Sequence, residues 1–201
     1  MEVELKRLGD LFEITSSKRV HKEDWTTEGV PFYRAREIVQ LFETGKVRQE
    51  LFITEEMYTG FKSRYGVPQA DDLLVTGVGT LGVCYVVKKA DRFYFKDGNI
   101  IWLKKRSDVE SRFVEYAFQS EFVKAQVKEG SQGATVGTYT IERANETLIP
   151  IPPKAEQRRI ISKLDAAFAE MAEVRGNYQK LLTQLDDLKK SILGTAFNGD
   201  L

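Results

Sequence analysis

The sequence predicts an α+β protein, in which a mixed globular domain is followed by one long C-terminal helix. Before residue 150, short runs of β-branched and aromatic residues alternate with glycine and polar turns, as strands and their connections do. Prolines between Pro150 and Pro153 end this region, because proline lacks a backbone donor and restricts the residue before it. From Lys154 to about Phe197 there is no proline, and the composition favours helix. We therefore predict a globular domain over 1–153 and a helical region over 154–201.

Two pairs of strands are expected within the globular domain. Residues 72–76 and 83–87 are rich in β-branched residues and are bounded by glycines, so they predict two strands. Residues 92–95 and 100–103 flank the segment 96–99, whose Asp-Gly step is typical of a hairpin turn. We expect these two segments to form a second hairpin.

One helix is expected near the end of the globular domain. Apolar residues between Val109 and Val127 recur with helical spacing, with Asp108 as the N-cap and Gly130 as the stop. Residues 131–137 then predict a polar loop.

A glycine motif lies between the first two predicted strands. Gly77, Gly79 and Gly82 match the G-x-G-x-x-G pattern of dinucleotide-binding folds. In such folds a helix follows the glycines, so that its N-terminus meets the pyrophosphate. Here residues 83–87 predict a strand instead, and we interpret the glycines as a tight turn that uses positive φ angles.

The predicted C-terminal helix carries a heptad stripe of apolar residues. Its positions are Ile160, Leu164, Ala167, Met171, Val174, Tyr178, Leu181, Leu185, Leu188 and Ile192. Ile161, Phe168 and Leu182 widen the stripe on one flank, and Gly176 falls on the opposite, outer face. The stripe is roughly 50 Å long at about 1.5 Å per residue. A single helix cannot bury such a stripe against itself, so we expect a partner helix. The alternative is that the helix folds back onto the globular domain.

Composition restricts the class of protein. The chain has 201 residues, and 30 basic residues balance 30 acidic ones. No stretch is long and apolar enough to cross a bilayer, the N-terminus has no signal-peptide character, and one cysteine suits a reducing compartment. We expect a cytoplasmic protein. Proteins that bind DNA without a partner protein usually have more basic than acidic residues. The equal numbers here therefore predict weak DNA binding by the isolated chain.

Residues suited to catalysis are sparse. His21 is the single histidine, and the sequence shows no Cys/His/Asp cluster with the spacing of a transition-metal site. His21 and Cys84 could form a base and nucleophile pair, but Cys84 lies inside an apolar strand, where a packed thiol is ordinary. We expect no catalytic residues, no metal and no cofactor.

Polar and basic side chains instead gather in four predicted loops. Arg and Gln can hydrogen-bond base edges in pairs, while Lys, Ser and Thr suit phosphates, so these groups are candidate DNA contacts. For any one residue, the alternative is solvated loop surface. The groups are Ser16, Ser17, Lys18 and Arg19; Tyr33, Arg34 and Arg36; Lys62, Arg64 and Tyr65; and Ser131, Gln132, Thr135, Thr138 and Tyr139.

Several motifs resemble the specificity (S) subunits of type I restriction-modification enzymes. Residues 8–19 and 29–34 are similar to the opening of their target recognition domain, and the glycine-rich segment 72–82 fits its middle. Residues 149–160, with the IPIPP and EQRRI sequences, resemble the family's PLPPLxEQxxI motif before its conserved spacer helix. Residues 188–201 resemble the end of that helix.

The resemblance implies a non-catalytic subunit that binds double-stranded DNA. It implies that the spacer helices pair as an antiparallel coiled coil and dock methyltransferase (M) subunits, with a restriction (R) subunit completing the nuclease. A standard S subunit has two recognition domains and two spacers, whereas this sequence has one of each. We therefore predict a homodimer that reads two inverted half-sites. Whether the sequence is a natural half-subunit or part of a longer one stays open.

A second hypothesis comes from another class of protein. The chain could be a coiled-coil adaptor whose globular domain binds protein rather than DNA, and the neutral charge balance favours this alternative.

Overall fold

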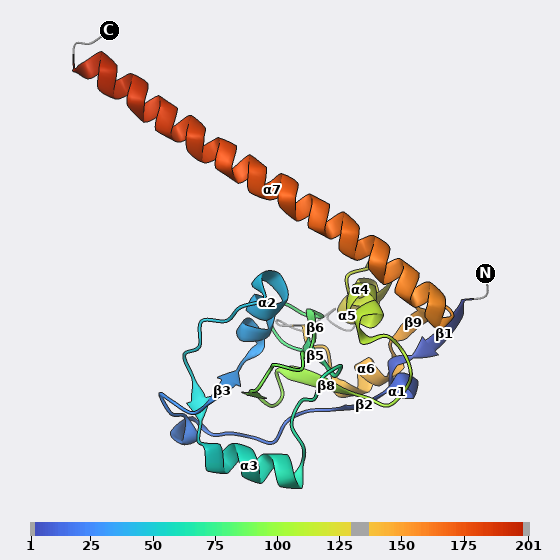
Figure 1. The fold of residues 1–201 in the computed structure, drawn as a ribbon. Coiled ribbons are helices and arrows are strands. Elements are labelled where there is room, and N and C mark those ends of the chain that lie inside the picture. The colour runs from blue at the N-terminus through green and yellow to red at the C-terminus, as the bar shows by residue number, and fades with distance from the viewer. Residues whose placement is uncertain (1–2, 130–136, 199–201) are drawn as a thin grey trace. The chain divides into compact units, whose positions relative to one another are not determined.

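The structure is a computed structural model in which residues 3–129 and 137–198 are described (Figure 1). Its strands are β1 (Glu4–Arg7), β2 (Phe12–Thr15), β3 (Val30–Tyr33), β4 (Phe52–Ile53), β5 (Leu73–Thr76), β6 (Cys84–Val86), β7 (Tyr94–Phe95), β8 (Ile100–Lys105) and β9 (Leu148–Ile151). Its helices are α1 (Leu8–Leu11), the 3-10 helix η1 (Lys22–Asp24), α2 (Ala35–Thr44), α3 (Glu55–Arg64), α4 (Ser111–Phe118), α5 (Glu121–Glu129), α6 (Ile141–Glu146) and α7 (Lys154–Phe197). The predicted α+β class and the long C-terminal helix are confirmed.

The described strands form three small sheets. The four-stranded sheet has the order β2-β8-β5-β6, and each neighbouring pair in it is antiparallel. In the second sheet, β3 pairs with β4 antiparallel and with β7 parallel. The third sheet joins the two ends of the domain, because β1 pairs with β9. The two strands from residues 72–76 and 83–87 were predicted correctly, as β5 and β6.

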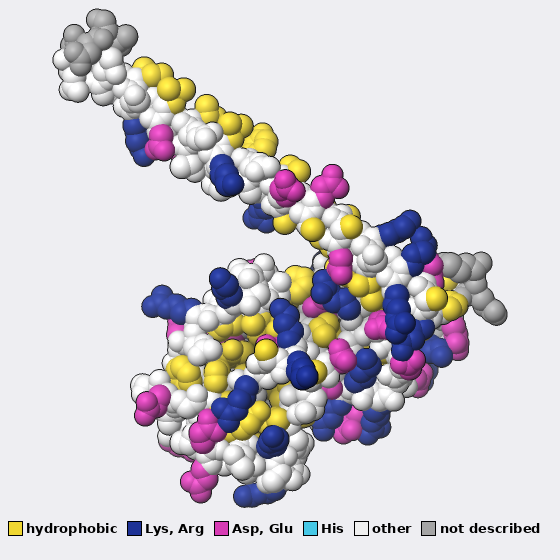
Figure 2. All heavy atoms as spheres, in the orientation of Figure 1, with side chains coloured by type: hydrophobic (Ala, Val, Ile, Leu, Met, Phe, Trp, Pro, Cys, Tyr) yellow, Lys and Arg dark blue, Asp and Glu magenta, His cyan; other side chains and the backbone are white. Residues whose placement is uncertain are grey.

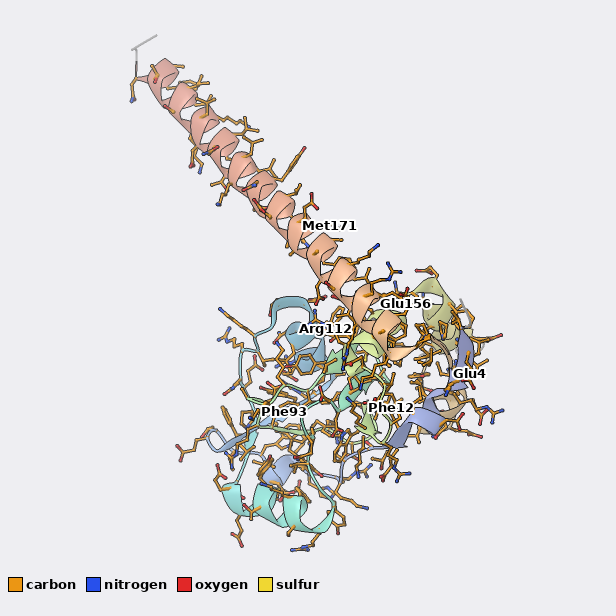
Figure 3. All side chains as sticks on the ribbon, turned by 45° about the vertical axis from the view of Figure 1, so that its right-hand side comes forward. Glu4, Phe12, Phe93, Arg112, Glu156 and Met171 are labelled. Carbon is orange, nitrogen blue, oxygen red and sulfur yellow. The ribbon has the colours of Figure 1, made fainter. Side chains whose placement is uncertain are left out.

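The core is rich in aromatic side chains. Phe12 and Phe93 lie inside the domain, with exposed fractions of 1% and 3% (Figure 3). The Tyr33 and Phe93 rings stack with their centroids 4.6 Å apart. The buried carboxylate of Asp72 accepts hydrogen bonds from Trp102 Nε1 at 2.8 Å and from the Lys105 backbone at 3.0 Å. These bonds join β5 to β8 and satisfy a charge that burial would otherwise destabilise.

The prediction of a second hairpin from residues 92–95 and 100–103 is wrong. A turn does form at Gly98, which has a φ of 72°, but β7 and β8 enter different sheets. β7 pairs with β3, and β8 pairs with β2 and β5. Both residues of β7 and the first four of β8 are buried. A hairpin with one solvated face would alternate buried and exposed residues.

The expected helix from Val109 to Val127 is two helices, α4 and α5. The break falls at Ser120, whose hydroxyl donates to the Ala117 carbonyl at 2.6 Å and accepts from the Val123 amide at 3.4 Å. A serine side chain that bonds the local backbone in this way competes with helix continuation. The N-cap of α4 is Glu110 rather than Asp108, and the expected stop at Gly130 lies outside the described residues.

The glycine motif is a turn, as predicted. It connects β5 to β6, and Gly79 and Gly82 have φ angles of 77° and 76°. A Cβ on Gly82 would lie only 3.1 Å from the Val127 side chain, so this glycine also permits close packing on α5.

The first turn of α7 is fixed to the globular domain. Gln157 is 3% exposed; its Nε2 donates to the Pro152 carbonyl at 2.9 Å, and its Oε1 accepts from the Glu110 amide at 3.0 Å. Lys154 pairs with Asp108, and Arg158 pairs with Glu110 at 2.8 Å. Accordingly, contacts divide the chain into Met1–Arg158 and Arg159–Leu201. The domain boundary that the prolines suggest lies just before this anchored turn.

Helix α7 has 44 residues and carries an apolar stripe along one side (Figure 2). In the chain alone, the stripe residues from Met171 to Ile192 are more than half exposed; Met171, for example, is 63% exposed and Leu188 is 56% exposed. A row of exposed large apolar side chains of this length is typical of an interaction surface.

We predict that Gln157→Leu destabilises the globular domain by about 2 kcal/mol, because it leaves the Glu110 amide and the Pro152 carbonyl buried without partners. Urea unfolding followed by tryptophan fluorescence measures this loss. The matched control is Gln179→Leu, on the exposed face of α7, which should change stability by less than about 0.5 kcal/mol. Equal effects of the two substitutions would contradict the anchoring role of Gln157.

Candidate nucleic-acid interface

The loop after β2 is held on the turn between β7 and β8. Ser17 Oγ donates to the Phe95 carbonyl at 2.7 Å, and the Lys18 amide donates to the Tyr94 hydroxyl at 2.8 Å. Ser16 Oγ donates to the Ile100 carbonyl at 3.1 Å. These bonds fix the backbone of residues 16–18, while the side chains of Lys18 and Arg19 stay exposed. A fixed backbone with exposed cations suits contact with a polyanion.

The first and third predicted groups lie together. Lys18 Nζ is 4.8 Å from the centroid of the Tyr65 ring, a cation–π contact. Tyr65 is 45% exposed, and its neighbour Phe61 stacks on the buried ring of Tyr94 at 4.6 Å. Burial raises the pKa of Tyr94 to about 12, so its hydroxyl keeps its proton near neutral pH.

Lys62 and Arg64 were expected in a loop, but they lie in the last turn of α3. The Thr54 hydroxyl caps this helix by accepting from the Met57 amide at 3.1 Å. Acidic residues occupy its first turn and these two basic residues its last, which is the favourable order for the helix dipole. Lys62, Ser63, Arg64 and Tyr65 are all exposed.

Part of the fourth group adjoins the first. A hollow of about 420 Å³ is lined by Ser16 and Thr138, together with Gly77 and Gly98 from the two turns. An isolated β-bridge between Val78 and Thr138 holds the edge of this hollow. The remaining candidates of this group, Ser131, Gln132 and Thr135, lie outside the described residues.

Tyr139, like Tyr33 of the second group, has a side chain that belongs to the core. It is 2% exposed, and its hydroxyl is 2.7 Å from the Thr147 hydroxyl. Burial raises the pKa of Tyr139 to about 12. Its ring packs edge-on against Phe118 and is not available at the surface.

These contacts define one surface, which we call the loop face: residues 16–19, 62–65, 77–79, 96–98 and Thr138. Arg19 joins it to the β7–β8 turn through an ion pair with Asp97 at 2.9 Å. The loop face thus combines exposed cations, one exposed aromatic ring and small polar side chains around a shallow hollow.

The second predicted group lies in and just before α2 and is paired with carboxylates. Arg34 Nη2 lies 2.8 Å from Glu37 and 3.4 Å from Glu50, and Arg36 Nε lies 2.5 Å from Glu37. Arg36 also pairs with Glu50. Arg36 is helical rather than in a loop, because the Glu37 side chain accepts from the Arg34 amide and starts the helix. Both guanidinium groups are neutralised within the chain, so DNA would have to compete with Glu37 and Glu50 for them.

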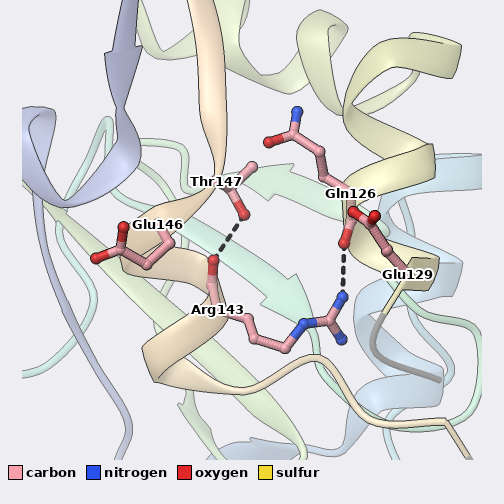
Figure 4. Close-up of a pocket in the computed structure, with 5 residues that line it drawn as sticks. All are labelled: Gln126, Glu129, Arg143, Glu146 and Thr147. Atoms are coloured by element: carbon pink, nitrogen blue, oxygen red, sulfur yellow. Dashed lines mark hydrogen bonds between the residues drawn. The ribbon is translucent and has the colours of Figure 1, made fainter. Parts of the chain in front are cut away.

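Arg143 holds the backbone of Thr138, a residue of the loop face, and was not anticipated from the sequence. Its guanidinium donates to the carbonyls of Gln126 at 2.6 Å and Val127 at 3.1 Å at the end of α5, and to that of Thr138 at 2.9 Å. These bonds lie beside a pocket of about 350 Å³ that Glu129, Glu146 and Thr147 also line (Figure 4). A charged donor shared among three carbonyls holds the segment before α6 against α5.

His21 and Cys84, the two residues considered for catalysis, lie in different elements, at the start of η1 and in β6. Cys84 is buried, and burial raises the pKa of its thiol, which opposes formation of a reactive thiolate. His21 is the N-cap residue of η1, and its backbone amide donates to Asp24 Oδ2 at 3.0 Å. Across residues 3–129 and 137–198, no group of three or more His, Cys, Asp or Glu side chains could hold a metal ion. Over the same residues, no helix is long and apolar enough to span a membrane.

Comparison with known proteins identifies relatives. Residues 1–196 match the family described as the Type I restriction modification DNA specificity domain. The chain is 29% identical over 159 residues to a candidate type I restriction enzyme specificity subunit of Haemophilus influenzae, covering 79% of this chain and 38% of that protein. It is 27% identical over 99 residues to the EcoKI specificity subunit of Escherichia coli, covering 49% of this chain and 21% of that protein.

Solved structures share the fold. A chain from a study of complex assembly in the type I R-M system has a TM-score of 0.75 at 21% identity, covering 99% of this chain and 46% of that one. The HsdS subunit of Thermoanaerobacter tengcongensis has a TM-score of 0.67, with the same identity and coverage. This chain therefore spans less than half the length of the relatives it matches.

We predict that Glu37 makes the domain sensitive to acid. Burial alone would raise the pKa of its carboxyl, but hydrogen bonds from Arg34 and Arg36 outweigh burial and lower the pKa below its ordinary value of 4.5. The stabilisation is therefore present above that value and is lost as the pH falls through the lowered folded-state pKa.

Glu37→Gln should be less stable than the parent at about pH 7 and should lose less stability on acidification to about pH 4. Urea unfolding at both pH values measures this difference. Glu43→Gln, an exposed position of the same helix, is the control and should behave as the parent does. The assignment is wrong if Glu37→Gln and the parent lose equal stability.

Proposed function

The chain belongs to the family of type I restriction-modification DNA specificity domains, and from this we propose that it is the sequence-reading subunit of a type I complex. The match of residues 1–196 to that family carries the proposal, because it includes both the globular domain and most of α7. The chain itself would bind DNA without catalysing a reaction, and catalysis would reside in the methyltransferase and restriction subunits. It would need no cofactor for binding.

The loop face is the part of the domain that we propose reads DNA. Its exposed Lys18 and Arg19 can reach phosphates or base edges, and Tyr65 offers an apolar ring beside them. We propose that this surface, with Arg34, Arg36 and the segment from Gln132 to Thr138, faces the major groove. The neutralised state of Arg34 and Arg36 in the free chain fits weak binding by the isolated subunit.

Two copies of α7 would pair through the exposed stripe. In an antiparallel pair centred on Gly176, every stripe position faces a stripe position of the other copy: Leu164 faces Leu188, Met171 faces Leu181, and Val174 faces Tyr178. A shift by one heptad would leave stripe residues at both ends without partners. The centred register therefore buries the largest apolar area.

The flank of the stripe favours the antiparallel orientation. Antiparallel coiled coils bring equivalent flanking positions together, so Phe168 of one helix would lie opposite Leu182 of the other. Phe168 and Leu182 are 43% and 47% exposed in the chain alone. In a parallel pair, Leu182 would instead lie opposite Asn177, and its apolar surface would stay partly solvated.

A dimer of this kind would be closed and two-fold symmetric, so it would present two identical loop faces to the duplex. It would read two inverted half-sites separated by unread base pairs, with the length of α7 setting the gap. The outer faces of the paired helices would then be free to dock methyltransferase subunits.

We predict that Leu185→Asp/Leu188→Asp gives a folded monomer, because it places charges in the proposed interface, opposite the apolar Ala167 and Leu164 of the other copy. Light scattering measures the mass, and circular dichroism checks that the domain stays folded. The control Gln179→Asp/Thr183→Asp adds the same charge to the outer face of α7 and should leave a dimer. If the double leucine variant is still a dimer, the stripe is not the interface.

We predict that the purified chain, with its methyltransferase subunit, selects one sequence from a random duplex pool. The selected sequence should contain two inverted copies of a half-site with a constant gap. Absence of enrichment would overturn the reading function and favour the adaptor hypothesis, in which the globular domain binds protein. On the selected duplex, Arg34→Ala tests the role of this residue: equal weakening on selected and scrambled DNA makes it a phosphate contact.

A further inference from the structure

A second basic surface lies beside the loop face. A hollow of about 480 Å³ is formed by residues between Tyr58 and Lys62 of α3, the loop at residues 67–70 and the turn at residues 88–92. Its charged lining residues are Lys62, Lys88, Lys89, Asp91 and Arg92. We call it the basic hollow. The turn is closed by a hydrogen bond from the Asp91 amide to the Lys88 carbonyl at 3.0 Å, which holds the two adjacent lysines at its tip.

The acidic groups near the basic hollow are already engaged. Asp91 Oδ2 accepts from the Tyr85 hydroxyl at 2.7 Å and from the Lys88 amide at 2.8 Å. Glu55 holds the Arg92 guanidinium, with Arg92 Nη1 at 2.8 Å from its carboxylate. Among the ion pairs of the described residues, none involves Lys62, Lys88 or Lys89.

The basic hollow therefore carries a local surplus of positive charge. The hollow has four cationic side chains and, with Glu55 counted beside Asp91, only two carboxylates. This surplus occurs in a chain whose 30 basic residues balance 30 acidic ones. At Arg34 and Arg36, by contrast, two cations share two carboxylates, so no surplus of charge remains there. Three clustered lysines without an ion pair among the described residues, in a chain of balanced charge, form an electrostatic footprint for an anion.

The basic hollow and the loop face share the last turn of α3. Lys62 lines the hollow, while Tyr65, three residues later, contacts Lys18 of the loop face. One helical turn rises only about 5.4 Å, so a duplex on the loop face would bring its backbone within reach of Lys62.

We infer that the basic hollow binds a backbone phosphate of the duplex that the loop face reads, with Lys62, Lys88 and Lys89 as the contacting side chains. Lysines suit this role, since their compact, flexible charges neutralise phosphate without reading sequence. The inference rests on the proposed reading function. It adds Lys88 and Lys89, which lie outside the loop face, to the residues that position the domain on DNA, and it makes Lys62 a phosphate contact.

The test is Lys88→Ala/Lys89→Ala in the full chain. Fluorescence anisotropy with the selected duplex and a scrambled duplex, each over a range of salt concentrations, gives the affinity and its salt slope. We expect equal weakening on both duplexes and a salt slope smaller by about 1 for each protomer. Circular dichroism verifies folding, and Lys62→Ala alone should act in the same direction.

The control is Lys180→Ala/Lys190→Ala, which removes the same charge from the outer face of α7 and should leave the slope unchanged. An unchanged slope in Lys88→Ala/Lys89→Ala, with the parent still preferring the selected duplex, overturns the inference but leaves the reading function intact. Weakening on the selected duplex alone would make these lysines base contacts and also overturns it. A parent chain with no preference between duplexes overturns the reading function itself, and the inference, which rests on that function, falls with it.

Discussion

The buried amide of Gln157 is the interaction on which the proposed use of this protein depends. It binds a carbonyl in the proline segment and the backbone amide that begins α4, and so it fastens the first turn of α7 to the globular domain. Glu110, at the same point, also pairs with Arg158. A side-chain amide satisfies both backbone groups with its one donor and one acceptor side, which an apolar side chain of equal size could not do. The first turn of α7 is therefore joined to the globular domain by a specific contact as well as by the chain itself.

The parts of the fold that were predicted correctly are those that local sequence determines. The stripe of α7 repeats over many turns, and β5 and β6 carry β-branched residues between glycines, so neither needed tertiary information. The hairpin at Gly98 and the single helix after Val109 failed for a different reason. There, the partner of each strand and the hydroxyl bonds of Ser120 decided the outcome, and neither is visible in the spacing of apolar residues.

The candidate site shows the same division. The sequence predicted Lys18, Arg19 and Tyr65 as candidate DNA contacts, and the structure places them in one exposed surface. It could not show that Tyr139 is a core residue or that Arg34 and Arg36 share Glu37 and Glu50, because burial and ion pairing depend on chain folding. Lys88 and Lys89 were missed, although two adjacent lysines directly after a predicted strand were a usable signal. The local surplus of positive charge around them is visible only when the engagement of Asp91 and Glu55 is known.

Helix α7 carries all of the stripe residues, and each candidate for DNA contact precedes it in the chain. If the two copies associate as we propose, natural selection can alter what is recognised without disturbing how the subunits associate. Variation in the surface loops would then create new target sequences, while the spacing between the recognised halves stays constant. New recognition in such a lineage would arise by exchange of a domain rather than by redesign of an assembly.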